Sequence, residues 1–533
     1  MRQFTYRMMR LVVGTAVVAA IPAMGQLLGQ NLFPSNSPWN QNISNAPVAT
    51  NSAAIIAAIG GTVKIHPDWG ADNPADGTSP LYGIPYNVVH GNSTPKTGVI
   101  IDDYPGESDI VPAPIPTNAV IEGDFENGPN TNGPGYNPNQ RGDSHLLVWD
   151  EDNNVAYEFY GAARPSDTNT LDETVHTDGV WHAAQESVWN YNTNDFRPLG
   201  YTSADAAGLS VLAGLARPDE GLPVSQGGQG AIHHALRMTL PSSIVSDQYI
   251  YPASHIVTRP GTLPMGARLR LKNNSTVNAL IATMGPESQV VAHAMQQYGL
   301  ILADIGSSMY VSGASAAGNA TNGINLVWDM DDILSGLEQL RASNFDVVNL
   351  APAVTNLSQS SGNAGSQLTI NGYNFAGAAG HLSVFFGGTA ATAVNVLGDS
   401  QISVTVPPGS GTVDITVQSG LYEPDTYDNP GANVNGPIFG YGTSATNAAD
   451  KFTYGATPKI LSISTTGGNF IINGTNNSGS GGTYEVLAST NLLLPPASWT
   501  VLASNSFDNK GNFSLTNALS STNPGLFYML RVP

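Results

Sequence analysis

Short runs of alternating apolar and polar residues, separated by glycine, proline and asparagine, recur along most of this 533-residue chain. Alternation with a period of two lets one face of a strand pack on a core while the other faces water. The 58 glycines and 36 prolines supply the tight turns that many short strands need. The sequence therefore predicts a mainly β protein. Its length predicts about two to four domains, because a single core stops growing near roughly 250–300 residues.

The composition excludes several classes of partner and site. With 40 acidic and 19 basic residues, the chain has a formal net charge of −21. A nucleic-acid partner is not expected, because binding phosphates requires lysine and arginine. The chain has no cysteine, which excludes disulfides, thiolate metal sites and cysteine nucleophiles. No cofactor is predicted, and a metal would need histidines or carboxylates as ligands.

Residues 1–25 have the pattern of a secretory signal peptide. Three arginines within the first ten residues precede the apolar segment 11–21, and small residues follow it. We expect cleavage before Gln26. The apolar segment is shorter than the roughly 20 residues that a membrane span needs. The mature protein is therefore expected without a membrane span, in the periplasm, at the cell surface or secreted.

Residues 26–350 are predicted to form one large β-rich domain with a few helices. Either a jelly-roll-like sandwich or an α+β fold is compatible with the pattern. The segments 145–149 and 155–160 flank a polar turn and predict a hairpin. The segments 300–304 and 309–312 predict a second hairpin.

Three helices are expected within this region. Residues 53–59 follow Ser52, a residue type that caps helices, and end at a Gly-Gly pair. A second helix begins at Pro286 and carries an apolar stripe. A third is capped by Asp329 or Asp331 and has a similar stripe.

Residues 351–456 contain an ordered set of short strands. The segments are LTINGYNF at 368–375, VFFGG at 384–388, ISVTVP at 402–407, GTVDITV at 411–417 and FTY at 452–454. This set resembles an IPT/TIG domain, an immunoglobulin-like β-sandwich, although the insertion at 421–449 departs from the family pattern. The resemblance implies a spacer or binding module of a secreted or surface protein. Some such modules lie beside the catalytic domains of glycan-degrading enzymes.

Residues 457–533 predict a third β-rich unit, with strands at 469–474, 483–488, 499–502, 513–515 and 527–531. This unit resembles small β modules that are appended to many bacterial secreted proteins. The resemblance implies no activity.

Candidate catalytic residues all fall in the large domain, where no nucleophile elbow, phosphate loop or dinucleotide fingerprint occurs. Glycosidases need two carboxylates, one of them protonated, and a histidine is a suitable base. We therefore expect His145, Asp219, Glu220 and His234 to form an acid–base set. Because the two acidic residues are adjacent in sequence, one of them would need a distant carboxylate such as Asp205 or Asp304 as its partner.

A second grouping combines histidines with one carboxylate, namely His145, Glu158, His233, His234 and His255. If the strands that carry them are neighbours, these side chains could form a metal site or a proton shuttle. The alternative is that each histidine makes local hydrogen bonds at a strand end.

The modular plan predicts a secreted, carbohydrate-active protein, either a polysaccharide hydrolase or a lyase. The alternative is a non-catalytic surface protein that binds glycans or mediates adhesion. A third hypothesis is a metal-dependent enzyme that uses the histidine grouping. The expected partner is a polysaccharide or a cell-surface glycan.

Overall fold

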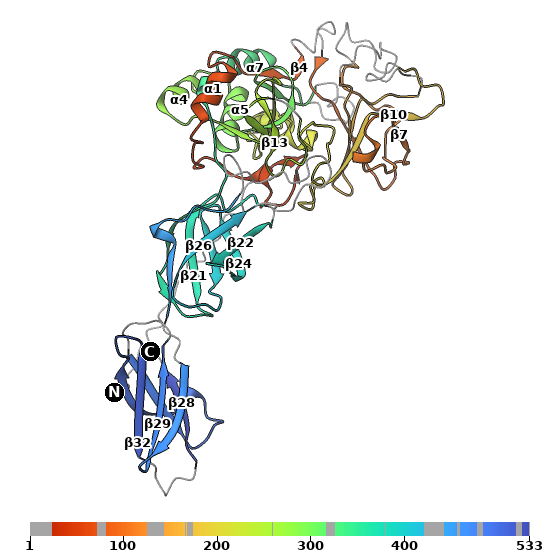
Figure 1. Cartoon of the computed structure of the whole chain (residues 1–533). Coiled ribbons are helices and arrows are strands. Elements are labelled where there is room, and N and C mark those ends of the chain that lie inside the picture. The colour runs from red at the N-terminus through yellow and green to blue at the C-terminus, as the bar shows by residue number, and fades with distance from the viewer. Residues whose placement is uncertain are drawn as a thin grey trace, which may run out of the picture.

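The structure is a computed structural model that describes residues 24–71, 81–124, 143–165, 167, 174–257, 260–315, 326–378, 380–419, 442–455, 459–476, 483–518 and 525–531. All but two residues of the expected signal peptide lie outside these ranges. Among the described residues, we find no helix with the length and apolar character of a membrane span. The protein is mainly β and multi-domain, as predicted, with a large N-terminal region followed by two smaller β units in a row (Figure 1).

The N-terminal region is built on a six-stranded mixed sheet with the order β18-β15-β16-β12-β17-β3. Its strands are β3 (His66–Asp68), β12 (Leu236–Leu240), β15 (Arg268–Leu271), β16 (Leu300–Ile305), β17 (Tyr310–Ser312) and β18 (Phe345–Val347). Strands β12 and β16 are parallel, as are β17 and β3, and the other pairs are antiparallel. Of the two predicted architectures, this region has the α+β one.

Four helices of this region lie together at the end far from β7 and β10 (Figure 1). They are α1 (Ser52–Ile59), α4 (Ser275–Ile281), α5 (Pro286–Gln297) and α7 (Met330–Leu337). The three predicted helices are confirmed. Asp329 caps α7 by accepting a hydrogen bond from the Asp332 amide, whereas α1 is preceded by Asn51 and includes Ser52.

The hairpin predicted from segments 300–304 and 309–312 is wrong. Strand β12 lies between β16 and β17 and pairs with both. Four of the five residues of β12 are buried, so this apolar strand occupies a central position in the sheet. Strand β16 therefore pairs with β12, which is distant in sequence, and not with β17, which follows it in the chain.

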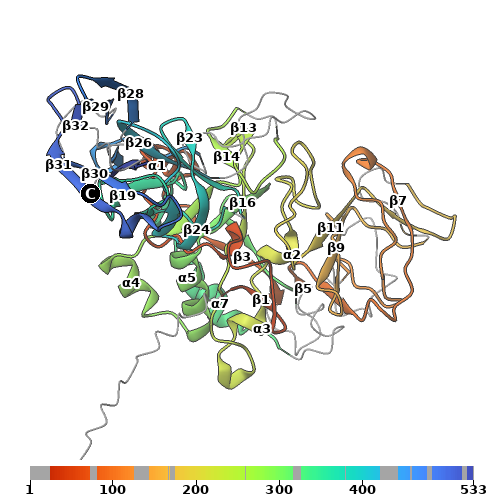
Figure 2. The same ribbon diagram turned by 90° about the horizontal axis from the view of Figure 1, so that it is seen from below.

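A second sheet, with the order β11-β9-β8-β6, forms a lobe beside the first (Figure 2). Its strands are β6 (Tyr86–Val89), β8 (Leu146–Asp150), β9 (Val155–Tyr160) and β11 (Gln185–Asn190). Strands β8 and β9 form the predicted hairpin. A parallel pair, β7 (Val99–Ile101) and β10 (Trp181–Ala183), belongs to the same lobe, which has its own hydrophobic cluster.

The unit that follows is a sandwich of two sheets, with the orders β19-β21-β25-β24 and β20-β27-β26-β22-β23. Its strands are β19 (Ala353–Leu357), β20 (Ser361–Gly362), β21 (Gln367–Tyr373), β22 (Leu382–Phe386), β23 (Thr389–Ala390), β24 (Thr392–Gly398), β25 (Gln401–Thr405), β26 (Thr412–Ser419) and β27 (Lys451–Tyr454). Apolar residues of both sheets share one core. The Asn374 side chain donates to the Asn349 and Ala351 carbonyls and so ties this unit to the N-terminal region.

The C-terminal unit has two three-stranded sheets, β28-β29-β32 and β31-β30-β33. The strands are β28 (Lys459–Thr466), β29 (Asn469–Thr475), β30 (Thr483–Ser489), β31 (Thr500–Ser506), β32 (Asn512–Ala518) and β33 (Phe527–Arg531). Its core is a small cluster centred on Tyr484 and Phe513.

Candidate functional site

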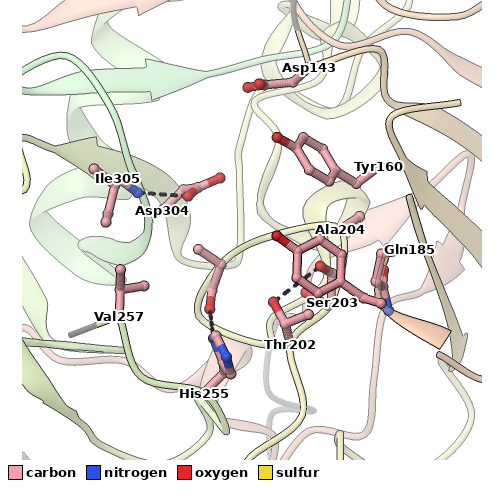
Figure 3. Close-up of a pocket in the computed structure, with 12 residues that line it drawn as sticks. Asp143, Tyr160, Gln185, Thr202, Ser203, Ala204, His255, Val257, Asp304 and Ile305 are labelled. Carbon is pink, nitrogen blue, oxygen red and sulfur yellow. Dashed lines mark hydrogen bonds between the residues drawn. The ribbon is translucent and has the colours of Figure 1, made fainter. Parts of the chain in front are cut away.

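A pocket of about 280 Å³ opens between the two lobes of the N-terminal region (Figure 3). The second lobe contributes Tyr160 at the end of β9 and Gln185 at the start of β11, and the six-stranded sheet contributes Asp304 at the end of β16. The complete wall consists of Tyr104, Asp143, Tyr160, Gln185, Thr202, Ser203, Ala204, Ala206, His255, Val257, Asp304 and Ile305. Two distant parts of the chain therefore form the pocket together.

Asp304 is the most perturbed acid of the pocket wall. Its side chain is 21% exposed, and its carboxylate lies 3.7 Å from Arg237 of β12. Burial raises the pKa of Asp304 well above its ordinary value, and the neighbouring Asp205 raises it further, against the opposing effect of Arg237. Arg237 donates a hydrogen bond from Nε to Asp205 Oδ2 at 2.9 Å, so its main ionic partner is Asp205 and not Asp304. The site thus favours the protonated form of the Asp304 carboxyl.

Asp143 and Tyr160 form the opposite wall. Figure 3 shows Asp143 above the Tyr160 hydroxyl, with the Asp304 carboxyl across the same space. Asp143 is exposed. Burial raises the pKa of Tyr160, and the charges of Asp143 and Asp304 add to this rise. Tyr160 therefore remains a neutral phenol that can donate a hydrogen bond into the pocket.

His145, a predicted catalytic residue, lies behind the pocket wall and is 2% exposed. Its Nδ1 is 2.5 Å from Glu122 Oε2, and its Nε2 is 3.0 Å from the Ala204 carbonyl oxygen. Burial lowers the pKa of His145, but the charge of Glu122 and the hydrogen bond to it raise that pKa more, to about 10. The doubly protonated ring donates one hydrogen bond to Glu122 and one to the Ala204 carbonyl, and so fixes the position of Ala204 in the pocket wall.

Asp219, Glu220 and His234 meet in a different, buried cluster around Arg217. The short helix α3 (Pro218–Gly221) carries the two acids. Glu220 Oε1 lies 2.7 Å from His234 Nε2 and 2.9 Å from Arg217 Nη2. We call these four residues the Arg217 cluster. Each of them is at most 6% exposed.

The Arg217 cluster is closed by the N-terminal segment of the described chain. The Leu28 amide donates to Asp219 Oδ2 at 2.8 Å, and Arg217 Nη2 donates to the Gln26 carbonyl at 3.1 Å. Burial raises the pKa of Asp219 to about 6, although Arg217 opposes the rise. Three of the four predicted catalytic residues therefore lie together in the structure, and His145 lies elsewhere. The cluster that these three form with Arg217 binds the N-terminal segment by hydrogen bonds. Their catalytic role stays a prediction.

The remaining members of the histidine grouping lie apart from one another. His255 is on the pocket wall, with Nδ1 2.7 Å from the Ala206 carbonyl oxygen. His233 contacts the Tyr298 hydroxyl at 3.3 Å. Buried Glu158 accepts hydrogen bonds from the Val211 and Leu212 amides at the start of the short helix α2 (Val211–Gly214). The alternative of local hydrogen bonding describes these residues.

Asp143 and Tyr160 were not predicted from the sequence as pocket residues, and Asp304 was predicted only as a distant partner of another acid. Asp143 lies three residues before β8, and Tyr160 is the last residue of β9. Because β8 and β9 form the predicted hairpin, residues just before the first strand and at the end of the second lie near the same end of the sheet, and this was a usable signal.

A family model described as the IPT/TIG domain matches residues 352–430. The match confirms the resemblance seen in the strand pattern, so the chain contains an IPT/TIG domain in the unit that follows the N-terminal region. No curated protein matches the chain.

Solved structures match parts of the chain at low similarity. One is a putative phosphatase from Bacteroides thetaiotaomicron, with 23% identity over 20% of this chain and 19% of that one, at a TM-score of 0.15. Another is an auxiliary nutrient binding protein from Bacteroides ovatus, with 19% identity over 22% of this chain and 24% of that one, also at 0.15. The chain thus spans less than a quarter of the length of either protein, and no functional conclusion follows from the similarity.

Proposed function

We propose that this is an extracellular carbohydrate-binding protein whose N-terminal region holds a neutral glycan in the pocket between its lobes. The chemistry of the pocket wall carries the proposal. The Asp143 carboxyl group and the Tyr160 hydroxyl can pair with sugar hydroxyls, and an aromatic ring can stack on the apolar face of a sugar. Tyr104 is 42% exposed and offers such a ring.

The size and charge of the pocket narrow the class of ligand. A volume of about 280 Å³ is at the lower end for small-molecule sites, which suits a chain end or a short segment of a glycan. The exposed Asp143 carboxyl group on the wall and a net charge of −21 repel anionic polysaccharides. A neutral glycan is therefore favoured over a uronate or a sulfated polymer. The two trailing β units then act as spacers.

The test is calorimetric titration of the purified protein with neutral and anionic oligosaccharides. We expect saturable binding of a neutral one, at least tenfold weaker in Tyr104→Ala. The matched control is Phe527→Ala, which removes an equally exposed ring (42%) from the C-terminal unit and should leave the affinity unchanged. Absence of binding to every neutral glycan, or equal affinities in both variants, would refute the proposal.

Glycoside hydrolysis is a second candidate, favoured by the different environments of Asp143 and Asp304. An enzyme of this kind needs one carboxyl held protonated and one ionised, and the raised pKa of Asp304 fits the acid. Release of reducing sugar that disappears in both Asp143→Asn and Asp304→Asn, measured at a glycan concentration that saturates each variant, would establish it. Binding without any product would leave the non-catalytic function.

A further inference from the structure

A separate group of side chains lies at the end of the parallel pair β7 and β10. Ile100 and His182 are partners in this pair, and the Asp102 amide donates to the Ala183 carbonyl at 2.9 Å. Asp102 follows β7 directly, so the pairing fixes its carboxylate beside His182. The loop that leads into β10 supplies a third side chain, His176.

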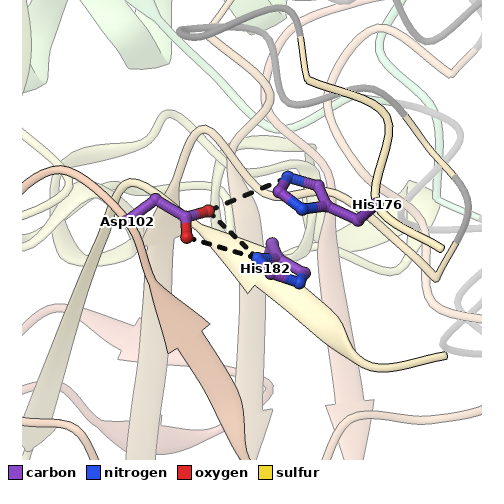
Figure 4. A group of neighbouring side chains, drawn as sticks. All are labelled: Asp102, His176 and His182. Carbon is purple, nitrogen blue, oxygen red and sulfur yellow. Dashed lines mark hydrogen bonds and ion pairs between the residues drawn. The ribbon is translucent and has the colours of Figure 1, made fainter. Parts of the chain in front are cut away.

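The three side chains converge on one point (Figure 4). Asp102 Oδ2 lies 3.1 Å from His182 Nδ1 and 3.8 Å from His176 Nε2. The two imidazole rings are stacked, with centroids 3.4 Å apart and an interplanar angle of 14°. One ligand atom from each residue lies within 4.8 Å of the others.

His176 shows that this group is incomplete by itself. Its side chain is 10% exposed, and its buried Nε2 has no hydrogen-bond partner. A buried polar atom without a partner costs free energy. That nitrogen faces the same carboxylate oxygen as His182, so a cation between the three groups would satisfy it.

We propose that Asp102, His176 and His182 bind a divalent transition-metal ion, with zinc as the best-suited probe. Two imidazoles and one carboxylate form a zinc ligand set that leaves a fourth position for water or a ligand. Ligand atoms about 2 Å from a tetrahedral ion are roughly 3.3 Å apart. Zinc binding therefore requires the three ligand atoms to move closer together and the two stacked imidazole rings to turn so that both nitrogens point at the ion. Asp178 Oδ2 lies 3.0 Å from His182 Nε2, and such a carboxylate orients a metal-bound imidazole.

The metal proposal does not depend on the glycan proposal, although the segments that carry the metal ligands continue into the pocket wall. Tyr104, two residues after Asp102, and Gln185, three residues after His182, both line the pocket. At about 3.3 Å per residue, these wall residues lie on the order of 10 Å along the chain from the metal ligands.

The experiment is zinc titration of the full-length secreted protein after removal of bound metal with a chelator. We expect one zinc per chain, and an affinity at least tenfold lower in His176→Ala and in Asp102→Asn. Asp178→Asn should weaken zinc binding about tenfold. Visible absorption of the cobalt(II) form gives a second readout, because its intensity distinguishes a tetrahedral protein site from the octahedral hydrated ion.

The matched control is His90→Ala. His90 is an exposed imidazole whose Nδ1 lies 3.1 Å from Glu151 and 3.3 Å from Asp152, so it tests whether any surface histidine beside carboxylates binds zinc equally well. We expect unchanged affinity in this variant. Failure to bind one equivalent of zinc, or binding that persists in both His176→Ala and Asp102→Asn, would overturn the proposal. Circular dichroism of each variant verifies that it is folded.

Discussion

The pocket and the Arg217 cluster are built from the same kinds of residue but differ in what covers them. Each combines acidic side chains with a histidine, and each has a buried arginine in contact with a carboxylate, Arg237 near the pocket and Arg217 in the cluster. The N-terminal segment closes the Arg217 cluster through the Leu28 amide and the Gln26 carbonyl. The pocket opens between two lobes.

This difference shows that residue composition alone does not separate a stabilising polar cluster from a binding site. In the closed cluster, every charge is paired within the protein, so removal of one partner is expected to destabilise the fold. In the open pocket, an acid such as Asp304 has weaker internal pairing and some exposure, so its removal is expected to alter ligand binding. The following predictions test this distinction, beginning with the largest effect.

Arg217→Ala should reduce the free energy of unfolding by about 3–5 kcal/mol, because it leaves Asp219 and Glu220 buried without their cation. Chemical denaturation measures the change. Arg531→Ala removes a surface ion pair with Glu485 and should cost less than about 1 kcal/mol. Similar losses in the two variants would contradict the view that the cluster is closed.

Stability should fall as the pH rises from about 4.5 to about 7. Burial raises the pKa of Glu158 to about 7 and that of Asp219 to about 6. The folded state therefore binds more protons than the unfolded state in this range, and its advantage is lost as these groups ionise. Each pKa unit corresponds to about 1.4 kcal/mol. We expect a higher Tm at pH 5 than at pH 7, and a weaker dependence of Tm on pH in Glu158→Gln. If Tm depends on pH equally strongly in that variant, ionisation of Glu158 does not contribute to the loss of stability.

Asp304→Asn should weaken binding of the pocket ligand about tenfold, equivalent to about 1.4 kcal/mol, with little loss of stability. The substitution removes a carboxyl that lies near Asp205, while Arg237 keeps its hydrogen bond to Asp205. Glu220→Gln is the matched variant in the closed cluster. It removes the charge that pairs with Arg217 and His234, so it should lower the Tm without changing ligand affinity. Calorimetric titration and thermal unfolding of both variants would show whether the two effects separate in this way.

Lys64→Met should have the smallest effect, less than about 1 kcal/mol, because the Lys64–Glu338 pair is 3.1 Å long with both side chains at least 36% exposed. Added salt should reduce the difference from the unmodified protein further. A larger loss in chemical denaturation would mean that exposure is a poor guide to the energetic role of charges in this protein.

Much of the local structure was predictable from the sequence. The β8–β9 hairpin, the helix that begins at Pro286 and the IPT/TIG strands all follow from patterns that lie within a few neighbouring residues. The pairing of β12 between β16 and β17 was not predictable in this way, because the partners are some 60 residues or more apart in the sequence. The pocket was missed for the same reason.

The sequence by itself determined the β-rich, modular plan, the acidic charge and the absence of disulfide and thiolate chemistry, because composition and short-range periodicity are properties of the chain alone. Only the tertiary structure decided which polar residues are covered and which are open. His145 and Asp143 are two residues apart, yet one pairs with Glu122 behind the wall and the other is exposed in the pocket. That outcome depends on contacts between distant segments, which no local pattern records.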